Sequence, residues 1–418
     1  MAKFRCRKKH YYIYSHTLNM KIVRRILFLC FSLVSAAVFA QFTPNNLELS
    51  NAVEDWVADP AAATLIYGHI STWDVSQVTD MSYLFANKSS FNDDISMWNV
   101  SSVTDMQYMF NYASTFNQPL DAWNVSSVTD MQYMFFGALA FNQYLNSWNV
   151  SSVTNMGYTF GGAKAFNQNL NAWIVSSVTD MSKMFYQATA FNGDLGNWLV
   201  NNVVNMEAMF NNATSFNKPL INWNVSSVTN MGLMFYQATA FNRDLSNWVP
   251  SSVTNMSIMF TNATAFNQSL GNWDISSVTG MVFMLNGTAM STANYDATLI
   301  GWSQQTVQSG VNLGASGLVY CASETARQSL INDDSWIIND GGDCVPPVTI
   351  YDYMIVEGVG SELFITKLHQ LALDDLNALT APNPPATLMD FVKGEVYNNN
   401  IFMEYDLQAI VDAINANN

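Results

Sequence analysis

The chain has 418 residues, four cysteines and a formal net charge of −16, from 16 Lys and Arg against 32 Asp and Glu. Eight of the basic residues and none of the acidic ones lie in residues 1–40, so the remainder carries a formal charge of −24. A surface this acidic repels phosphate groups, which argues against nucleic acid and anionic membranes as partners.

The first 40 residues have the pattern of a signal peptide. Met20 begins a segment in which three basic residues precede an apolar stretch over 26–39, and Ala40 is a small residue that signal peptidase accepts. We predict Met20 as the true start and cleavage before Gln41. The alternative is a membrane anchor, but the stretch is shorter than the roughly 20 residues a span needs. We therefore expect a secreted or cell-surface protein with no transmembrane segment after cleavage.

Residues 41–72 are predicted to form an N-terminal cap, with an amphipathic helix around 47–57. Beyond them a 25-residue repeat begins, and residues 73–285 contain nine copies without an insertion. Val follows each repeat tryptophan by five positions and Met by eight. The repeat tryptophans are Trp73, Trp98, Trp123, Trp148, Trp173, Trp198, Trp223, Trp248 and Trp273.

A fixed period of this length predicts a repeat solenoid, because one unit cannot bury its large apolar residues alone and stacked units can. Within each unit the alternation around Trp98 predicts a short inward-facing strand. The following apolar residues recur at helical spacing, with Thr104 as a helix N-cap, so we predict one short strand and one short helix per coil. That stripe consists of Val103, Met106, Met109, Phe110 and Ala113.

The repeated segment WNVSSVTDMQYMF, followed by AFNQ, resembles the BspA-like leucine-rich-repeat surface proteins. It is most similar to the bacterial surface-protein repeat of the DUF285 group. The resemblance covers roughly residues 47–345, and it implies a right-handed, leucine-rich-repeat-like α/β solenoid at the cell exterior. For function it implies only adhesion or partner binding. The copies here are 25 residues long rather than 26, and Trp and Met replace the usual Leu and Ile.

Residues 286–345 are predicted to form a C-terminal cap, with helices over 291–305 and 324–336 and a strand-like segment over 311–320. Cys321 and Cys344 are the two cysteines beyond the signal peptide, so in an oxidising compartment we predict a disulfide between them. Two buried free thiols are the alternative. Residues 346–418 are predicted to be a linker and a small helical or partly disordered region.

Several polar residues also recur once per coil. Asn92 and its equivalents are predicted to form a structural amide ladder rather than a ligand site, because buried amides need hydrogen-bond partners. Thr104 and its equivalents are interpreted as helix caps, with a flat threonine array for ice or sugar as the alternative. The tryptophans are interpreted as a core spine, with an exposed sugar-stacking track as the alternative.

A column of acidic and amide side chains is interpreted as stabilising the start of each predicted helix. Closely stacked carboxylates repel one another, so calcium bound along this column is the alternative, although calcium requires more oxygen ligands than one residue per coil supplies. We expect no cofactor otherwise. The carboxylates of this column are Asp80, Asp105, Asp130 and Asp180.

Motifs for catalysis are absent from the sequence: only His69 and His369 lie beyond residue 40, and there is no nucleophile elbow or phosphate-binding loop. We expect no enzymatic activity. The residue after each repeat tryptophan varies in type and is predicted to point outward, where a binding solenoid holds its ligand. We expect a protein or glycan ligand there, and self-association into a surface layer is the alternative. The candidate ligand-facing residues are Asn99, Asn124, Asn149, Ile174, Leu199 and Asn224.

Overall fold

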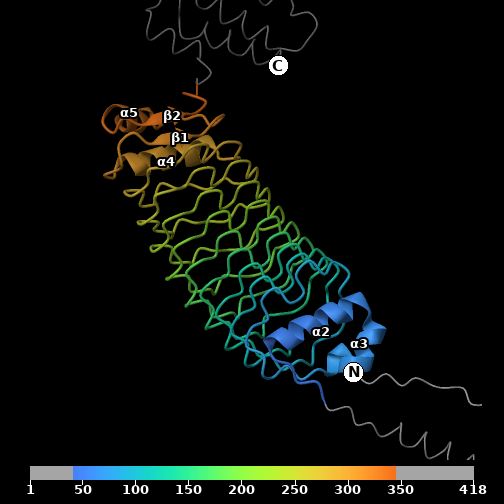
Figure 1. The fold of residues 1–418 in the computed structure, drawn as a ribbon. Helices are drawn as coiled ribbons and strands as arrows, with labels where there is room; N and C mark the ends of the chain where they lie inside the picture. The colour runs from blue at the N-terminus through green and yellow to red at the C-terminus, as the bar shows by residue number, and fades with distance from the viewer. Residues whose placement is uncertain (1–40, 345–418) are drawn as a thin grey trace, which may run out of the picture.

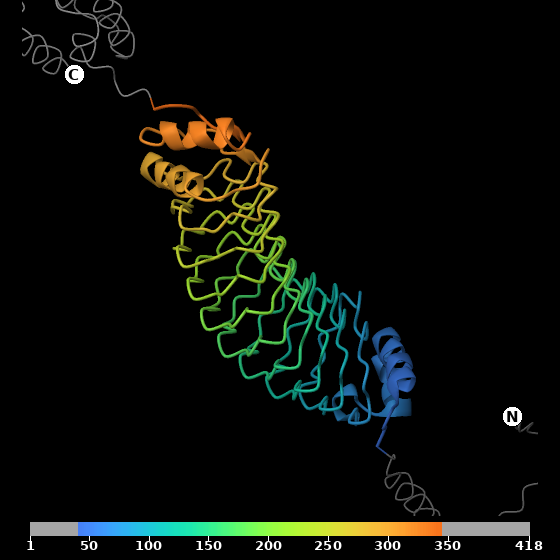
Figure 2. The same cartoon turned by 90° about the vertical axis from the view of Figure 1, so that its left-hand side faces the viewer.

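A computed structural model describes residues 41–344, and the predictions for 1–40 and 346–418 lie outside this range. Successive 25-residue coils stack into a column between two mostly helical ends (Figures 1 and 2). Parallel bridges join equivalent residues 25 positions apart, from Asp80–Asp105 through to Asn255–Gly280. The backbone of one coil is therefore hydrogen-bonded to the next along the length of the column.

The N-terminal end is covered by α2 (Asn46–Ala58), followed by α3 (Pro60–Tyr67) and the short η1 (Ile70–Thr72). Asn45 caps α2 by accepting the Glu48 amide proton, and the Glu48 carboxylate accepts that of Asn45. The face of α2 that includes Leu49 and Trp56 is buried in the core. The predicted helix over 47–57 is confirmed.

The coils contain turns and isolated bridges rather than the predicted strand and helix, so that part of the prediction is wrong. In the first coil the amide of Leu84 bonds to the carbonyl of Met81, whereas the amide of Tyr83 bonds across to Gln107 at 3.0 Å. Tyr83 and Asn87 have φ of 60° and 61°, and equivalent residues in the later coils are also positive. A left-handed residue at every turn interrupts an α-helix, and the alternate amides bond to the next coil instead.

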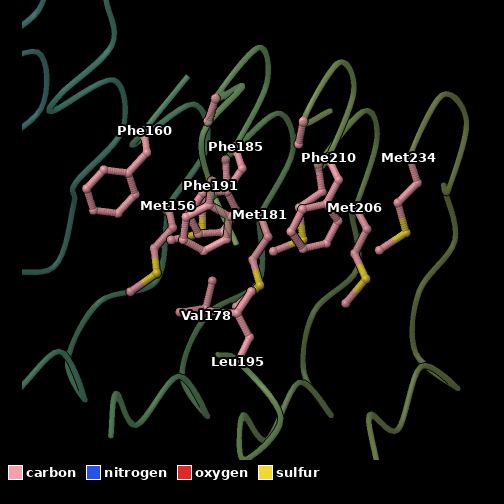
Figure 3. Packing of buried hydrophobic residues seen from close by; sticks show 14 of the residues in the cluster. Met156, Phe160, Val178, Met181, Phe185, Phe191, Leu195, Met206, Phe210 and Met234 are labelled. Carbon is pink, nitrogen blue, oxygen red and sulfur yellow. The ribbon is translucent and has the colours of Figure 1, made fainter. Parts of the chain in front are cut away.

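The interior of the column is a continuous core in which equivalent side chains of neighbouring coils lie in rows (Figure 3). The rings of Trp148 and Trp173 are stacked with centroids 6.4 Å apart, and those of Phe110 and Phe135 are 5.4 Å apart. From Trp98 to Trp273, each repeat indole N–H donates to a buried carbonyl, as Trp148 does to Leu120 at 2.8 Å. The tryptophans are therefore the predicted core spine, and their faces are not open to a sugar.

The C-terminal end contains α4 (Thr292–Ser303), β1 (Asn312–Gly314), α5 (Glu324–Asn332) and β2 (Ile337–Asn339). Both predicted helices are confirmed. The expected strand over 311–320 shortens to three residues, which pair in parallel with the unpredicted β2.

Two contacts fasten this C-terminal end. Cys321 and Cys344 form the predicted disulfide, with Cα atoms 5.0 Å apart. The Arg327 guanidinium donates to both carboxylate oxygens of Asp340 at 2.9 and 3.0 Å.

Within residues 41–344, no helix is long and apolar enough to cross a membrane.

Candidate ligand-binding face

The residue after each repeat tryptophan is exposed in the seven central coils, and we call this row the post-tryptophan column. Its neighbours on both sides, such as Trp98 and Val100, are buried, so the residue between them faces solvent. The structure therefore brings all six predicted ligand-facing residues onto one side of the column. They are Asn99, Asn124, Asn149, Ile174, Leu199 and Asn224.

The asparagines of this column have a structural role that sequence reasoning missed. The side-chain oxygen of Asn99 accepts the amide proton of Ser101 at 3.2 Å, and the other three asparagines make the same bond. Such a bond closes a tight turn within one coil. Asn is thus the residue that satisfies the backbone at this position.

Three coils depart from this arrangement. Ile174, Leu199 and Val249 are 57%, 63% and 51% exposed, and none of their side chains can accept the turn amide proton. Val249 extends the apolar set beyond the predicted residues. Val204, which interrupts the threonine column, adds a further exposed apolar side chain at 43%. In the coils of Ile174, Leu199 and Val249, the hydrogen bond from the turn N–H to an asparagine side chain is therefore missing, and an apolar side chain faces solvent instead.

The residues next to this column in the chain are uncharged in seven successive coils. We call this surface the neutral face; it runs from the residue before each tryptophan to the sixth residue after it. Asp74 and Asp274 occupy the post-tryptophan column in the two terminal coils and bracket the neutral face. The neutral face comprises residues 97–104, 122–129, 147–154, 172–179, 197–204, 222–229 and 247–254.

The acidic and amide column closes turns instead of capping helices, so that interpretation is wrong. Asp105 Oδ1 accepts the amide proton of Gln107 at 2.9 Å, and Asp80, Asp130 and Asp180 make the same bond two residues on. Burial raises the pKa of the Asp130 carboxyl, and the nearby Asp105 adds to the increase. Among residues 41–344, no group of three or more His, Cys, Asp or Glu side chains is arranged to hold a metal ion.

Two other columns are structural. The side-chain oxygen of Asn92 accepts the amide proton of Asn117 at 2.8 Å, and this bond recurs up the stack, which confirms the amide ladder. The Thr104 hydroxyl donates to the carbonyl of Thr79 at 3.2 Å, and the later threonines repeat the contact. The threonines are therefore not helix caps, and their hydroxyls link neighbouring coils.

A stack of four tyrosines was not anticipated, although Tyr occupies the tenth position after Trp in four successive coils. We call Tyr83, Tyr108, Tyr133 and Tyr158 the tyrosine ladder. Successive ring centroids are 4.5, 4.6 and 4.2 Å apart, with interplanar angles of 6°, 8° and 13°. The Lys183 ammonium lies 5.2 Å from the Tyr158 centroid and closes this end of the stack.

The family model described as "Mycoplasma protein of unknown function, DUF285" matches residues 57–173, 120–211 and 193–298, which together exceed half of the chain. The chain belongs to the DUF285 family. The DUF285 matches span the coils, the end of α2 and the first part of α4. The residues of the neutral face and of the tyrosine ladder therefore all lie within the matched part of the chain. No curated protein matches the chain.

Proposed function

We propose that this DUF285 protein is a secreted or cell-surface scaffold that binds a protein or glycan through its neutral face. We assign its stack of coils to the BspA-like class of right-handed, leucine-rich-repeat-like solenoids. The exposed apolar set Ile174, Leu199 and Val249 carries the proposal, because these residues replace the asparagine that closes the turn elsewhere.

The replacement brings no advantage to the fold. A hydrogen bond of this kind contributes about 0.5–1.5 kcal/mol, and more than half of each apolar side chain remains in water. Apolar groups clustered on a polar surface are typical of an interaction site. Ile174 and Leu199 lie on adjacent coils, roughly 4.8 Å apart along the stack, so one ligand can contact both.

The chemistry of the neutral face indicates the kind of ligand. Amide groups from Asn99, Asn124 and Asn149 lie on the coils preceding the apolar set, and the segments of the neutral face contain no ionisable residue of Asp, Glu, Lys or Arg type. An uncharged partner surface with apolar and hydrogen-bonding groups is complementary to this arrangement. We infer binding rather than catalysis, since the sequence contains no nucleophile elbow or phosphate-binding loop.

An exported location is supported by the Cys321–Cys344 disulfide, because disulfides persist in oxidising compartments. The signal-peptide pattern of the first 40 residues supports the same location.

Self-association into a surface layer is the second candidate. The neutral face favours it because two acidic copies approach each other with least repulsion where neither carries charge. Sedimentation of the purified protein over a range of concentrations separates this candidate from binding of a foreign ligand.

The test is binding of the protein to arrays of glycans and extracellular proteins, first with calcium and then with chelator. The double variant Ile174→Asn, Leu199→Asn restores the residue found at Asn149 and Asn224, so it is expected to fold. We expect it to lose most of the binding. Ile337→Asn removes an equally exposed apolar side chain, 57% in water, from the C-terminal cap and serves as the control. Unchanged binding by the double variant contradicts the proposal.

A further inference from the structure

The two ends of the tyrosine ladder differ. At one end the Lys183 ammonium lies over Tyr158 and pairs with a Glu207 carboxylate oxygen at 3.0 Å. At the other end Tyr83 packs one ring face on Tyr108, yet 54% of the residue is exposed. The opposite ring face of Tyr83 is therefore open to solvent.

Carboxylates accompany the ladder along the stack. The pKa of Tyr108 is raised by burial, then by the neighbouring Tyr83, and also by the charge of Asp130 on the next coil. Asp80 is the exposed member of this column in the coil of Tyr83. Its Oδ1 accepts the Ser82 amide proton at 2.8 Å, while no basic side chain of residues 41–344 pairs with it.

We propose that Tyr83 and Asp80 form a binding site for a lysine ammonium from a basic protein segment. Lys183 makes a related pair of contacts at the other end of the ladder, where its ammonium lies over the Tyr158 ring and pairs with the Glu207 carboxylate of the next coil. In the first coil Asp80 is the exposed carboxylate three residues before Tyr83. An ammonium over an aromatic face is attracted by the ring quadrupole, and the acidic protein draws cations toward it. This site does not depend on the neutral face, since it uses other residues and a cationic rather than an uncharged ligand.

The repeat supplies substitutions that keep the coil intact. Leu233 occupies the position of Tyr83 in a later coil with a φ of 61°, so Tyr83→Leu is compatible with the left-handed backbone. Asn155 occupies the position of Asp80 and accepts the equivalent amide proton at 3.0 Å, so Asp80→Asn retains the turn. Phe283→Leu is the matched control: Phe283 belongs to the same column and is also 54% exposed, but Gly280 replaces the carboxylate there.

The experiment is calorimetric titration of the purified protein with N-acetylated hexalysine amide, at physiological salt. The probe's neutral counterpart, in which every lysine is ε-acetylated, is expected not to bind. Tyr83→Leu and Asp80→Asn should each weaken hexalysine binding about two- to fivefold, whereas Tyr83→Phe keeps the ring and the affinity. Phe283→Leu should bind as the unmodified protein does. Equal affinity of the Tyr83→Leu variant, or an equal loss in Phe283→Leu, overturns the proposal, because attraction is then spread over the whole acidic surface.

Discussion

Thr159 interrupts a column of buried methionines, and Thr159→Met should stabilise the protein. Seven of the eight other coils have Met at this position, including Met134 and Met184 directly on either side, and Thr159 is only 1% exposed. The Thr159 hydroxyl donates to the carbonyls of Met156 and Met131 at 2.8 and 3.1 Å. Both carbonyls also accept backbone amide protons, from Thr159 and Met134 respectively, so neither loses its last partner when the hydroxyl is removed.

The magnitude follows from these contacts. Burying a methionine contributes about 1.5–3 kcal/mol, from which the threonine methyl, about 0.8 kcal/mol, and the hydroxyl bond, about 1 kcal/mol, are subtracted. The expected gain is about 0.5 kcal/mol, the centre of this difference, which for a domain of this size raises Tm by about 1 °C. Differential scanning calorimetry measures the shift. The reverse change, Met184→Thr, should lower the stability by about 2–4 kcal/mol.

A lowered Tm for Thr159→Met would refute the reasoning, because it would mean that the space around Thr159 has already closed and that a methionine overpacks it. The Met184→Thr variant shows whether overpacking is specific to the site of Thr159 or whether the column tolerates changes of side-chain volume in general. If both variants melt with the unmodified protein, packing between coils is looser than the rows of Figure 3 indicate.

Three further changes follow from the columns. Asp130→Asn should raise the unfolding free energy at neutral pH. The pKa of the Asp130 carboxyl is raised in the folded state, so its contribution to stability is largest below its ordinary pKa of 3.8 and is lost as pH rises through the raised value. Denaturant titrations at several pH values should show that this pH dependence disappears in the variant. Asn167→Ala removes the acceptor of the Asn192 amide proton at 2.8 Å and should cost about 1 kcal/mol in urea unfolding, whereas Asn167→Asp keeps an acceptor and should cost less. Reducing the Cys321–Cys344 disulfide should destabilise the C-terminal cap by roughly 3 kcal/mol. Hydrogen exchange should then become faster in α5 while the central coils keep their protection. A uniform loss of protection would contradict this expectation.

The apolar positions of each coil were predictable from the sequence, and the backbone conformation between them was not. Val103, Met106, Met109, Phe110 and Ala113 are all buried, as the stripe predicted. Their spacing of about three residues fits an α-helix. It fits equally well a series of turns in which the amide of one residue bonds to the carbonyl three residues earlier, as Met109 does to Met106. Local pattern alone does not separate the two.

The candidate site divides in the same way. Alternation around each tryptophan correctly placed Ile174 and Leu199 on the surface, because a residue between two buried neighbours faces outward. The role of Asn99 in closing its turn and the stacking of the tyrosines could be recognised only in the structure, since both depend on the direction of a side chain.

The sequence by itself determined the period, the identity of the core and the ends of the stack, because burial demands apolar residues wherever the coils meet. Only the tertiary structure decided how the backbone travels within a coil. The amides of Tyr83 and its equivalents bond to carbonyls 24 residues later, and such a partner exists only once the next coil is in place. Contacts of that range hold the left-handed residues in position, and they also bring Tyr83, Tyr108, Tyr133 and Tyr158 into one stack with an open end.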